Sequence, residues 1–183
     1  THAHLNFLAF EKDREKVIKK CLIEGVWMIN IGINYETSKR AVEIAEKYGK
    51  GVFAAVGLHP INLDTGLVKI KIDEKEGAHF EKEFDFQKYK KFALRSLGEG
   101  RVVAIGEIGL DYYWKPKTKR KLALFKEKQK DLLLRELKLA QELNLPVIFH
   151  CRMAHDDLIE IISGNPEIRP GRAVAHSFVG SLD

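Results

Sequence analysis

Short apolar runs alternate with longer amphipathic stretches along almost the whole chain, and this alternation constrains the fold more than any other feature. The apolar runs have strand length and occupy residues 2–7, 26–33, 52–58, 102–108, 147–150 and 173–178. Between them, apolar stripes recur at helical spacing over residues 11–24, 36–48, 86–97, 120–144 and 154–163. A strand, helix, strand order requires parallel pairing with right-handed crossovers.

The continuous apolar runs indicate a sheet that is covered on both sides, as in a doubly wound sheet or a barrel. The positions of the polar residues distinguish between these two folds. Side chains that can bind metal lie at or just beyond the carboxyl ends of the runs: His4, His59, Glu107, Asp111, His150 and His176. In a barrel those ends converge on one mouth, whereas an open sheet spreads them along a line. We therefore expect an α/β fold of the TIM-barrel type, with residues 1–183 forming a single domain.

One segment interrupts the alternation after the third apolar run. Apolar and charged residues alternate at 67–72 and again at 79–86, on either side of a Gly-containing stretch at 73–77. This pattern is typical of a β-hairpin. We expect the hairpin to be inserted after strand three, on the mouth side, where it could contact a substrate. The alternative is a surface hairpin without a function.

Composition excludes several classes of protein. Of the 183 residues, 45% are hydrophobic and 31% are charged, which is ordinary for a globular chain. No apolar stretch approaches the roughly 20 residues that cross a bilayer, and no leader precedes the first motif, so we expect a cytoplasmic location and no membrane partner. The two cysteines predict neither a disulfide framework nor a thiolate zinc site. No feature indicates an obligate protein partner.

The formal net charge of +5 favours an anionic substrate, because a basic surface steers phosphates toward a cleft. Lysines cluster at 88–91 and 115–121, although such runs are more often solvated helix faces or helix starts.

Five residues form a candidate set of metal ligands. His2 and His4 are a His-x-His pair, whose imidazoles point the same way in an extended strand. Glu107 lies in Gly-Glu-Ile-Gly-Leu-Asp, and His150 and His176 each lie at the tail of an apolar run. Imidazole and carboxylate are the ligands of hydrolytic metal sites, and a carboxylate can bridge two ions. The set predicts a metal-dependent hydrolase.

The stretches that carry these residues form a specific set over nearly the whole chain. They are Thr1-His-Ala-His-Leu, Val56-Gly-Leu-His-Pro, Ile105-Gly-Glu-Ile-Gly-Leu-Asp-Tyr-Tyr, Leu145-Pro-Val-Ile-Phe-His-Cys-Arg and Ala175-His-Ser-Phe-Val-Gly-Ser. In this order they resemble the TatD family of metal-dependent deoxyribonucleases. The resemblance implies a barrel of the amidohydrolase type, one or two divalent cations, and hydrolysis of phosphodiester bonds in DNA, often from the 3′ end.

The resemblance also implies roles for the candidate ligands. It makes His2 and His4 ligands of a first ion and Glu107 a ligand shared by both ions, while His150 and His176 hold the second. We expect two divalent cations, for which Mg, Mn, Zn and Co remain open. A water held between them would lose its proton near neutral pH, and the metal-bound hydroxide would attack the phosphorus. Glu107 is therefore also a catalytic candidate.

Three further residues receive roles from the resemblance. His59 is expected to contact the substrate phosphate at the mouth, and Asp111 to orient a neighbouring side chain rather than bind metal. Arg152 carries a planar guanidinium that suits phosphate oxygens, so we expect it to bind the DNA substrate as well.

The chain departs from the family pattern at both ends. The family's barrel has eight strands and an Asp ligand at the end of the eighth, whereas Asp183 stands just after the sixth apolar run. Thr1 opens inside a motif that an Asp and a short apolar run usually precede. We therefore expect an incomplete barrel, apparently truncated at both ends, with about six of the eight β/α units and without the C-terminal strands. By itself this chain is expected to be unstable and inactive, while a longer parent protein would be competent.

Two other functions stay open. An amidohydrolase acting on a cyclic amide or ester would use the same ligand scaffold, although that class usually has a Lys where Glu107 stands. A non-catalytic nucleic-acid-binding fragment would keep the basic surface without turnover. The choice between DNA and RNA, and between exonuclease and endonuclease action, is also open.

Overall fold

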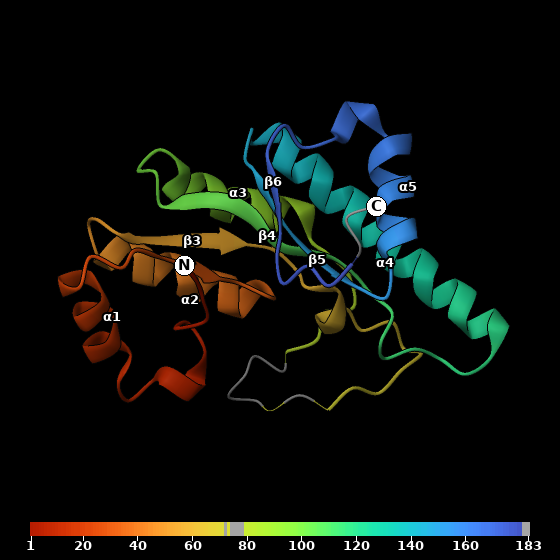
Figure 1. The fold of residues 1–183 in the computed structure, drawn as a ribbon, viewed down its shortest axis with the longest axis horizontal. Helices are drawn as coiled ribbons and strands as arrows, with labels where there is room; N and C mark the ends of the chain where they lie inside the picture. The colour runs from red at the N-terminus through yellow and green to blue at the C-terminus, as the bar shows by residue number, and fades with distance from the viewer. Residues whose placement is uncertain (72, 74–78, 181–183) are drawn as a thin grey trace.

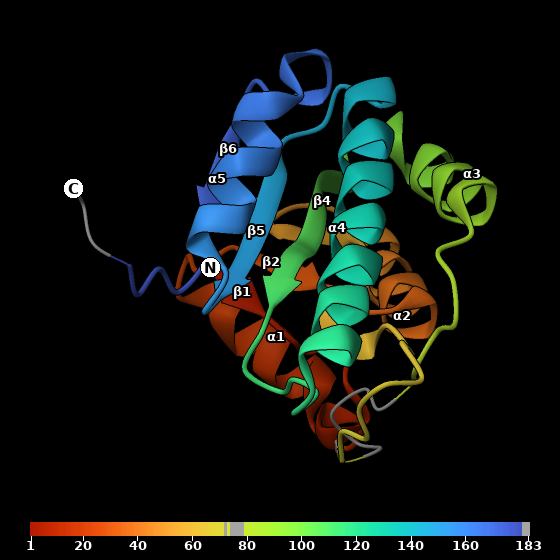
Figure 2. The ribbon, with the colours of Figure 1, turned by 90° about the vertical axis from the view of Figure 1, so that its right-hand side faces the viewer.

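The computed structural model describes residues 1–71, 73 and 79–180. Its centre is one parallel sheet of six strands in chain order. The strands are β1 His2–Ala3, β2 Met28–Ile31, β3 Val52–Val56, β4 Val102–Asp111, β5 Val147–Arg152 and β6 Ala173–Ala175. The sheet curls into a half-barrel, and the helices lie around its outside (Figures 1 and 2). The predicted fold of the TIM-barrel type is thereby confirmed.

The helices that were predicted between the strands are all present. They are α1 Arg14–Ile23, α2 Tyr35–Lys47, α3 Phe86–Leu97, α4 Lys119–Glu142 and α5 His155–Gly164. Side chains at their first turns explain where two of them begin. Asn34 and Thr37 form a reciprocal capping box at α2, and Asp85 accepts the N–H of Lys88 at 3.0 Å at α3.

The first strand is shorter than the predicted run of residues 2–7. The chain turns after β1, where the N–H of Phe7 donates to the carbonyl of His4 at 3.0 Å. Asn6 is fully buried and donates to the carbonyls of Ile31 and Thr37, both at 2.9 Å. Because these bonds tie Asn6 to β2 and α2, residues 4–7 cross the end of the sheet rather than extend it.

The described residues do not form the β-hairpin that was predicted after strand three. Residues 67–71, 73, 79 and 80 belong to no strand, while residues 72 and 74–78 lie outside the described residues. Glu81 forms an isolated parallel bridge with Leu63. Its carboxylate also accepts the N–H of Tyr35 at 2.6 Å and the hydroxyl of Tyr89 at 2.9 Å. The segment is therefore held by this single bridge to residues 62–64 and by side-chain contacts with α2 and α3.

The apolar side chains of the sheet are divided between two clusters. The larger cluster joins one face of the strands to the helices and includes Met28, Val56 and Leu137. The smaller cluster lies on the opposite, inner face and consists of Ile31, Ala55, Ala104 and Ile148. Because successive strand residues face opposite sides, every long strand needs apolar residues at consecutive positions. This explains the continuous apolar runs in the sequence.

Glu136 is a charged residue type in a fully buried position of α4. Its Oε1 accepts the N–H of Leu58 at 2.7 Å, and its Oε2 has no hydrogen-bond partner among the described residues. Burial raises the pKa of this carboxyl well above its usual value, and the hydrogen bond from Leu58 opposes this only in part. Glu136 is therefore protonated over the ordinary glutamate range.

We predict that Glu136→Gln becomes more stable relative to the wild type as the pH rises from 5 to 9. The folded state of the wild type holds a proton that the unfolded state releases above about pH 4.3, so its stability falls as the pH rises toward the folded pKa. The amide does not titrate and keeps an oxygen for Leu58. Each unit of raised pKa corresponds to about 1.4 kcal/mol.

Thermal unfolding of both proteins at pH 5, 7 and 9 measures this difference, with all other titrating groups in common. Parallel pH profiles for the two proteins would contradict a protonated Glu136.

Candidate metal centre

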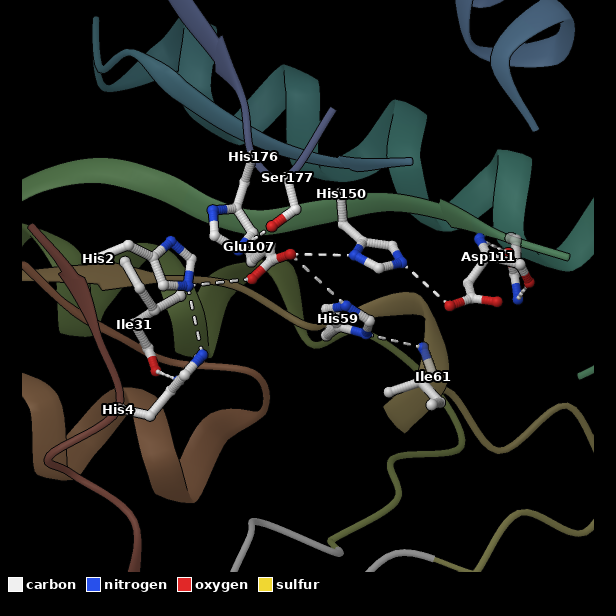
Figure 3. Close-up of polar contacts among 11 residues, drawn as sticks. His2, His4, Ile31, His59, Ile61, Glu107, Asp111, His150, His176 and Ser177 are labelled. Carbon is white, nitrogen blue, oxygen red and sulfur yellow. Dashed lines mark hydrogen bonds and ion pairs between the residues drawn. The ribbon is translucent and has the colours of Figure 1, made fainter. Parts of the chain in front are cut away.

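The carboxyl ends of the parallel strands gather the ligand-type side chains predicted from the sequence (Figure 3). His2, Glu107 and His150 lie within strands β1, β4 and β5. His4, His59 and His176 follow the ends of β1, β3 and β6 in the chain. All six side chains point toward one region in the close-up, from five of the six strands.

Two glycines allow β4 and β5 to approach one another at the site. Gly109 has a φ of +146°, and a Cβ there would meet the carbonyl oxygen of His150 at 1.9 Å. Gly106 has a φ of +157°, and a Cβ there would meet the Cβ of Ile148 at 2.7 Å. A side chain at either position would push the strands apart. The Gly-Glu-Ile-Gly motif is thus explained by close packing of strands that carry Glu107 and His150.

Glu107 is the centre of the cluster, and its two oxygens face different histidines. Oε2 lies 3.4 Å from Nε2 of His2. Oε1 lies 3.0 Å from Nδ1 of His150 and 3.9 Å from Nε2 of His59. The residue is only 5% exposed, so a carboxylate is buried with imidazoles as its neighbours. A carboxylate in this arrangement can serve two cations, one at each oxygen.

His176 and His4 lie beside His2 on the Oε2 side. The rings of His2 and His176 stack with centroids 3.7 Å apart, and each offers a ligand atom within 4.8 Å of one from Glu107. Nδ1 of His4 lies 3.2 Å from the carbonyl of Ile31, which fixes the proton on Nδ1. The free Nε2 of His4 then faces Nε2 of His2 at 3.3 Å. With its proton on Nδ1, His4 accepts a hydrogen bond from Nε2 of His2, and loss of that proton from His2 would leave both nitrogens able to bind one cation.

His59 lies on the Oε1 side, where its ligand atoms and those of Glu107 and His150 fall within 4.8 Å of one another. Its Nδ1 accepts the N–H of Ile61 at 3.1 Å, so the neutral ring carries its proton on Nε2. A protonated nitrogen donates a hydrogen bond and cannot bind a metal. In this orientation the Nε2–H of His59 faces Oε1 of Glu107, 3.9 Å away.

His150 is held between two carboxylates. Its Nε2 lies 3.0 Å from Oδ2 of Asp111, while its Nδ1 faces Glu107. The second carboxylate oxygen of Asp111 accepts the N–H of Tyr113 at 2.9 Å. The contact required for Asp111 to orient a neighbouring side chain is therefore present. A carboxylate behind a ligating histidine fixes its tautomer and increases its basicity.

The electrostatics of the cluster match a cation site. Burial raises the pKa of Glu107, but the His150 hydrogen bond and the histidine charges outweigh it and hold that pKa at about 2. Burial lowers the pKa of His2 to about 4, and burial together with the charge of His150 lowers that of His59 to about 3. Burial also lowers the pKa of His150, yet its bonds to Asp111 and Glu107 raise it to about 9. At neutral pH the cluster therefore has an ionised Glu107, neutral imidazoles at His2 and His59, and a protonated His150, and a divalent cation beside His150 would replace its proton.

Arg152 lies at the end of β5, outside this cluster. Its guanidinium carbon is 3.5 Å from the ring centroid of Tyr113, and the side chain is exposed. The ring of Trp114 packs edge-on against Tyr113 with centroids 5.0 Å apart. Arg152 thus lies at the carboxyl end of the sheet, where its guanidinium rests on the ring of Tyr113.

The whole chain, residues 1–183, matches the family model described as TatD related DNase. The chain belongs to the TatD family. It is 33% identical to the uncharacterized metal-dependent hydrolase YabD of Bacillus subtilis, over 100% of this chain and 61% of that protein. It is 32% identical to the 3′-5′ ssDNA/RNA exonuclease TatD of Cronobacter sakazakii, over 94% of this chain and 55% of that protein.

Solved structures agree with this assignment. The crystal structure of the TatD homologue YjjV from Escherichia coli matches with a TM-score of 0.73 and 31% identity, over 100% of this chain and 60% of that one. The chain spans 50–61% of the length of the curated relatives it matches. Within the described residues no helix has the length and hydrophobicity to span a membrane. The YabD relative is named a metal-dependent hydrolase, and two groups of side chains in this chain, one around each oxygen of Glu107, could each hold a metal ion.

We predict that a divalent transition metal stabilises the protein through Glu107 and His150. A ligand at 100 times its Kd raises the free energy of unfolding by about 2.7 kcal/mol. Glu107→Ala and His150→Ala should lose most of this increment. Thermal unfolding after chelation, with and without added Mn or Zn, measures it.

His79→Ala is the matched control, because His79 is exposed and its side chain lies outside the cluster. An equal rise in melting temperature for His79→Ala and Glu107→Ala would show that the metal binds elsewhere.

Proposed function

We propose that this protein hydrolyses phosphodiester bonds in DNA with two divalent cations, removing nucleotides from the 3′ end. The observation that carries the proposal is the buried Glu107, whose two carboxylate oxygens face separate histidines. When bound, the cations would activate water as the nucleophile and polarise the phosphoryl oxygens. The nuclease names of relatives such as the exonuclease of Cronobacter sakazakii support a nucleic-acid substrate.

The residues of the chain divide the remaining tasks. The first cation would be held by His2, His4, Glu107 and His176, and the second by Glu107 and His150. The expectation from sequence assigned His176 to the second cation. We assign it to the first, because the ring of His176 stacks on that of His2. Burial of Glu107 keeps bulk water from competing for its oxygens.

His59 and Arg152, at the carboxyl ends of the strands, would bind the substrate. The Nε2–H of His59 points into the cluster and would donate to a phosphate oxygen beside Glu107. Arg152 would contact the next phosphate with its planar fork, held in place by the ring of Tyr113. The net charge of +5 assists the approach of the polyanion.

We predict that the protein shortens a DNA oligonucleotide from its 3′ end when Mg or Mn is present, and that Glu107→Ala reduces the rate by at least about 100-fold. Loss of the shared carboxylate removes a ligand from both cations at once. The measurement follows 5′-labelled single strands with a free or a blocked 3′ end by electrophoresis.

Glu99→Ala removes an exposed glutamate and serves as the matched control. Intact DNA under every divalent ion, together with hydrolysis of a cyclic amide or ester, would replace the proposal with a carbon-centred amidohydrolase. Cleavage that survives Glu107→Ala would refute the assignment of the centre.

We predict that Arg152→Ala raises the KM for single-stranded DNA about 10-fold and leaves kcat nearly unchanged. Loss of one phosphate contact weakens binding uniformly and reduces the salt slope of log Kd by about 0.7. Steady-state kinetics at several salt concentrations measure both quantities. Arg169→Ala removes the same charge ahead of β6, at the opposite end of the sheet, and should change neither. A fall in kcat alone would place Arg152 in the chemical step.

A further inference from the structure

Gln129 is a polar residue in the buried face of α4, with only 1% of its surface exposed. Both ends of its amide bond to the main chain of one residue. Oε1 accepts the N–H of Asp111 at 2.8 Å, and Nε2 donates to the carbonyl of Asp111 at 3.0 Å. One side chain therefore fixes the main chain at the last residue of β4.

The geometry of the sheet explains why Asp111 needs this partner. On one side β4 pairs with β5 as far as Asp111 and Arg152, and the N–H of Tyr112 donates to the carbonyl of Arg152 at 2.9 Å. On the other side β3 ends at Val56, opposite Ile105. The N–H and carbonyl of Asp111 face this side, beyond the end of β3. Gln129 provides the two hydrogen bonds that a longer β3 would have made.

The main chain of Asp111 is held by Gln129, and its side chain contacts a residue of the metal centre. Its Oδ2 lies 3.0 Å from Nε2 of His150 and orients that ring, so that Nδ1 faces Oε1 of Glu107 at 3.0 Å. A shift of the Asp111 main chain would move the carboxylate and rotate the imidazole. Such a rotation directs Nδ1 away from a cation held by Glu107.

We propose that Gln129 is a positioning residue of the metal centre, acting through Asp111 on the orientation of His150. The inference rests on the proposed function for the identity of the centre, but it concerns metal affinity and not turnover. A purely structural Gln129 would contribute to stability alone. A positioning Gln129 affects one cation selectively, and only while Asp111 is present.

The test is a calorimetric titration with Mn or Zn of protein from which a chelator has removed bound metal. The binding step that His150→Ala removes identifies the cation held by His150. Gln129→Met keeps the volume of the side chain and deletes both hydrogen bonds, and we expect it to weaken this step about 10-fold. The double variant Gln129→Met with Asp111→Ala should bind this cation as Asp111→Ala alone does, because the effect passes through the carboxylate.

Tyr89→Phe is the matched control. The Tyr89 side chain is fully buried, and its hydroxyl donates to Glu81, outside the metal centre. It should lower stability without changing either affinity. The proposal is overturned if Gln129→Met leaves the His150-dependent step unchanged, weakens all steps alike, or multiplies the effect of Asp111→Ala. Because the readout is metal binding, a lack of nuclease activity would refute the proposed function and leave this result standing.

Discussion

Parallel pairing of the strands in chain order is the constraint on which the rest of the structure depends. It brings the carboxyl end of every strand to the same edge, so residues as distant in sequence as His2 and His176 have stacked rings. It also leaves apolar residues on both faces of the strands, which the outer helices and the inner cluster bury. The buried carboxylate of Glu107 is tolerated at this edge because the protonated His150 of the neighbouring strand β5 compensates its charge.

The strands do not all end at the same level, and α4 compensates for the difference. Where β3 stops, buried polar side chains of α4 bond to the main chain that would otherwise be unpaired: Glu136 to Leu58 just beyond β3, and Gln129 to Asp111 on β4. Both lie on one helix face, seven positions apart, which is two turns. The helix therefore contributes hydrogen bonds as well as apolar area, and the bonds lie next to residues of the candidate centre.

Much of the fold and of the ligand set was predictable because each depends on local pattern. The spacing of His2 and His4, and the position of Glu107 in a glycine-containing strand, are visible in the sequence. Contacts that depend on tertiary geometry were not visible. Gln129 is one polar residue within a long helix, and nothing local connects it to Asp111. The pattern at 67–72 predicted strand pairing, but the hydrogen bonds of Glu81 to Tyr35 and Tyr89 hold the following segment against α2 and α3.

The close approach at Gly109 has a consequence for how sequence variation at this centre should be understood. The residue contributes no functional group, yet even a methyl group there would collide with the carbonyl oxygen of His150. The separation of two ligand-bearing strands is thus encoded by a missing side chain. In a saturation library, Gly109 should tolerate substitution as poorly as the histidines do. A search for functional positions that considers only residues with reactive side chains would miss it.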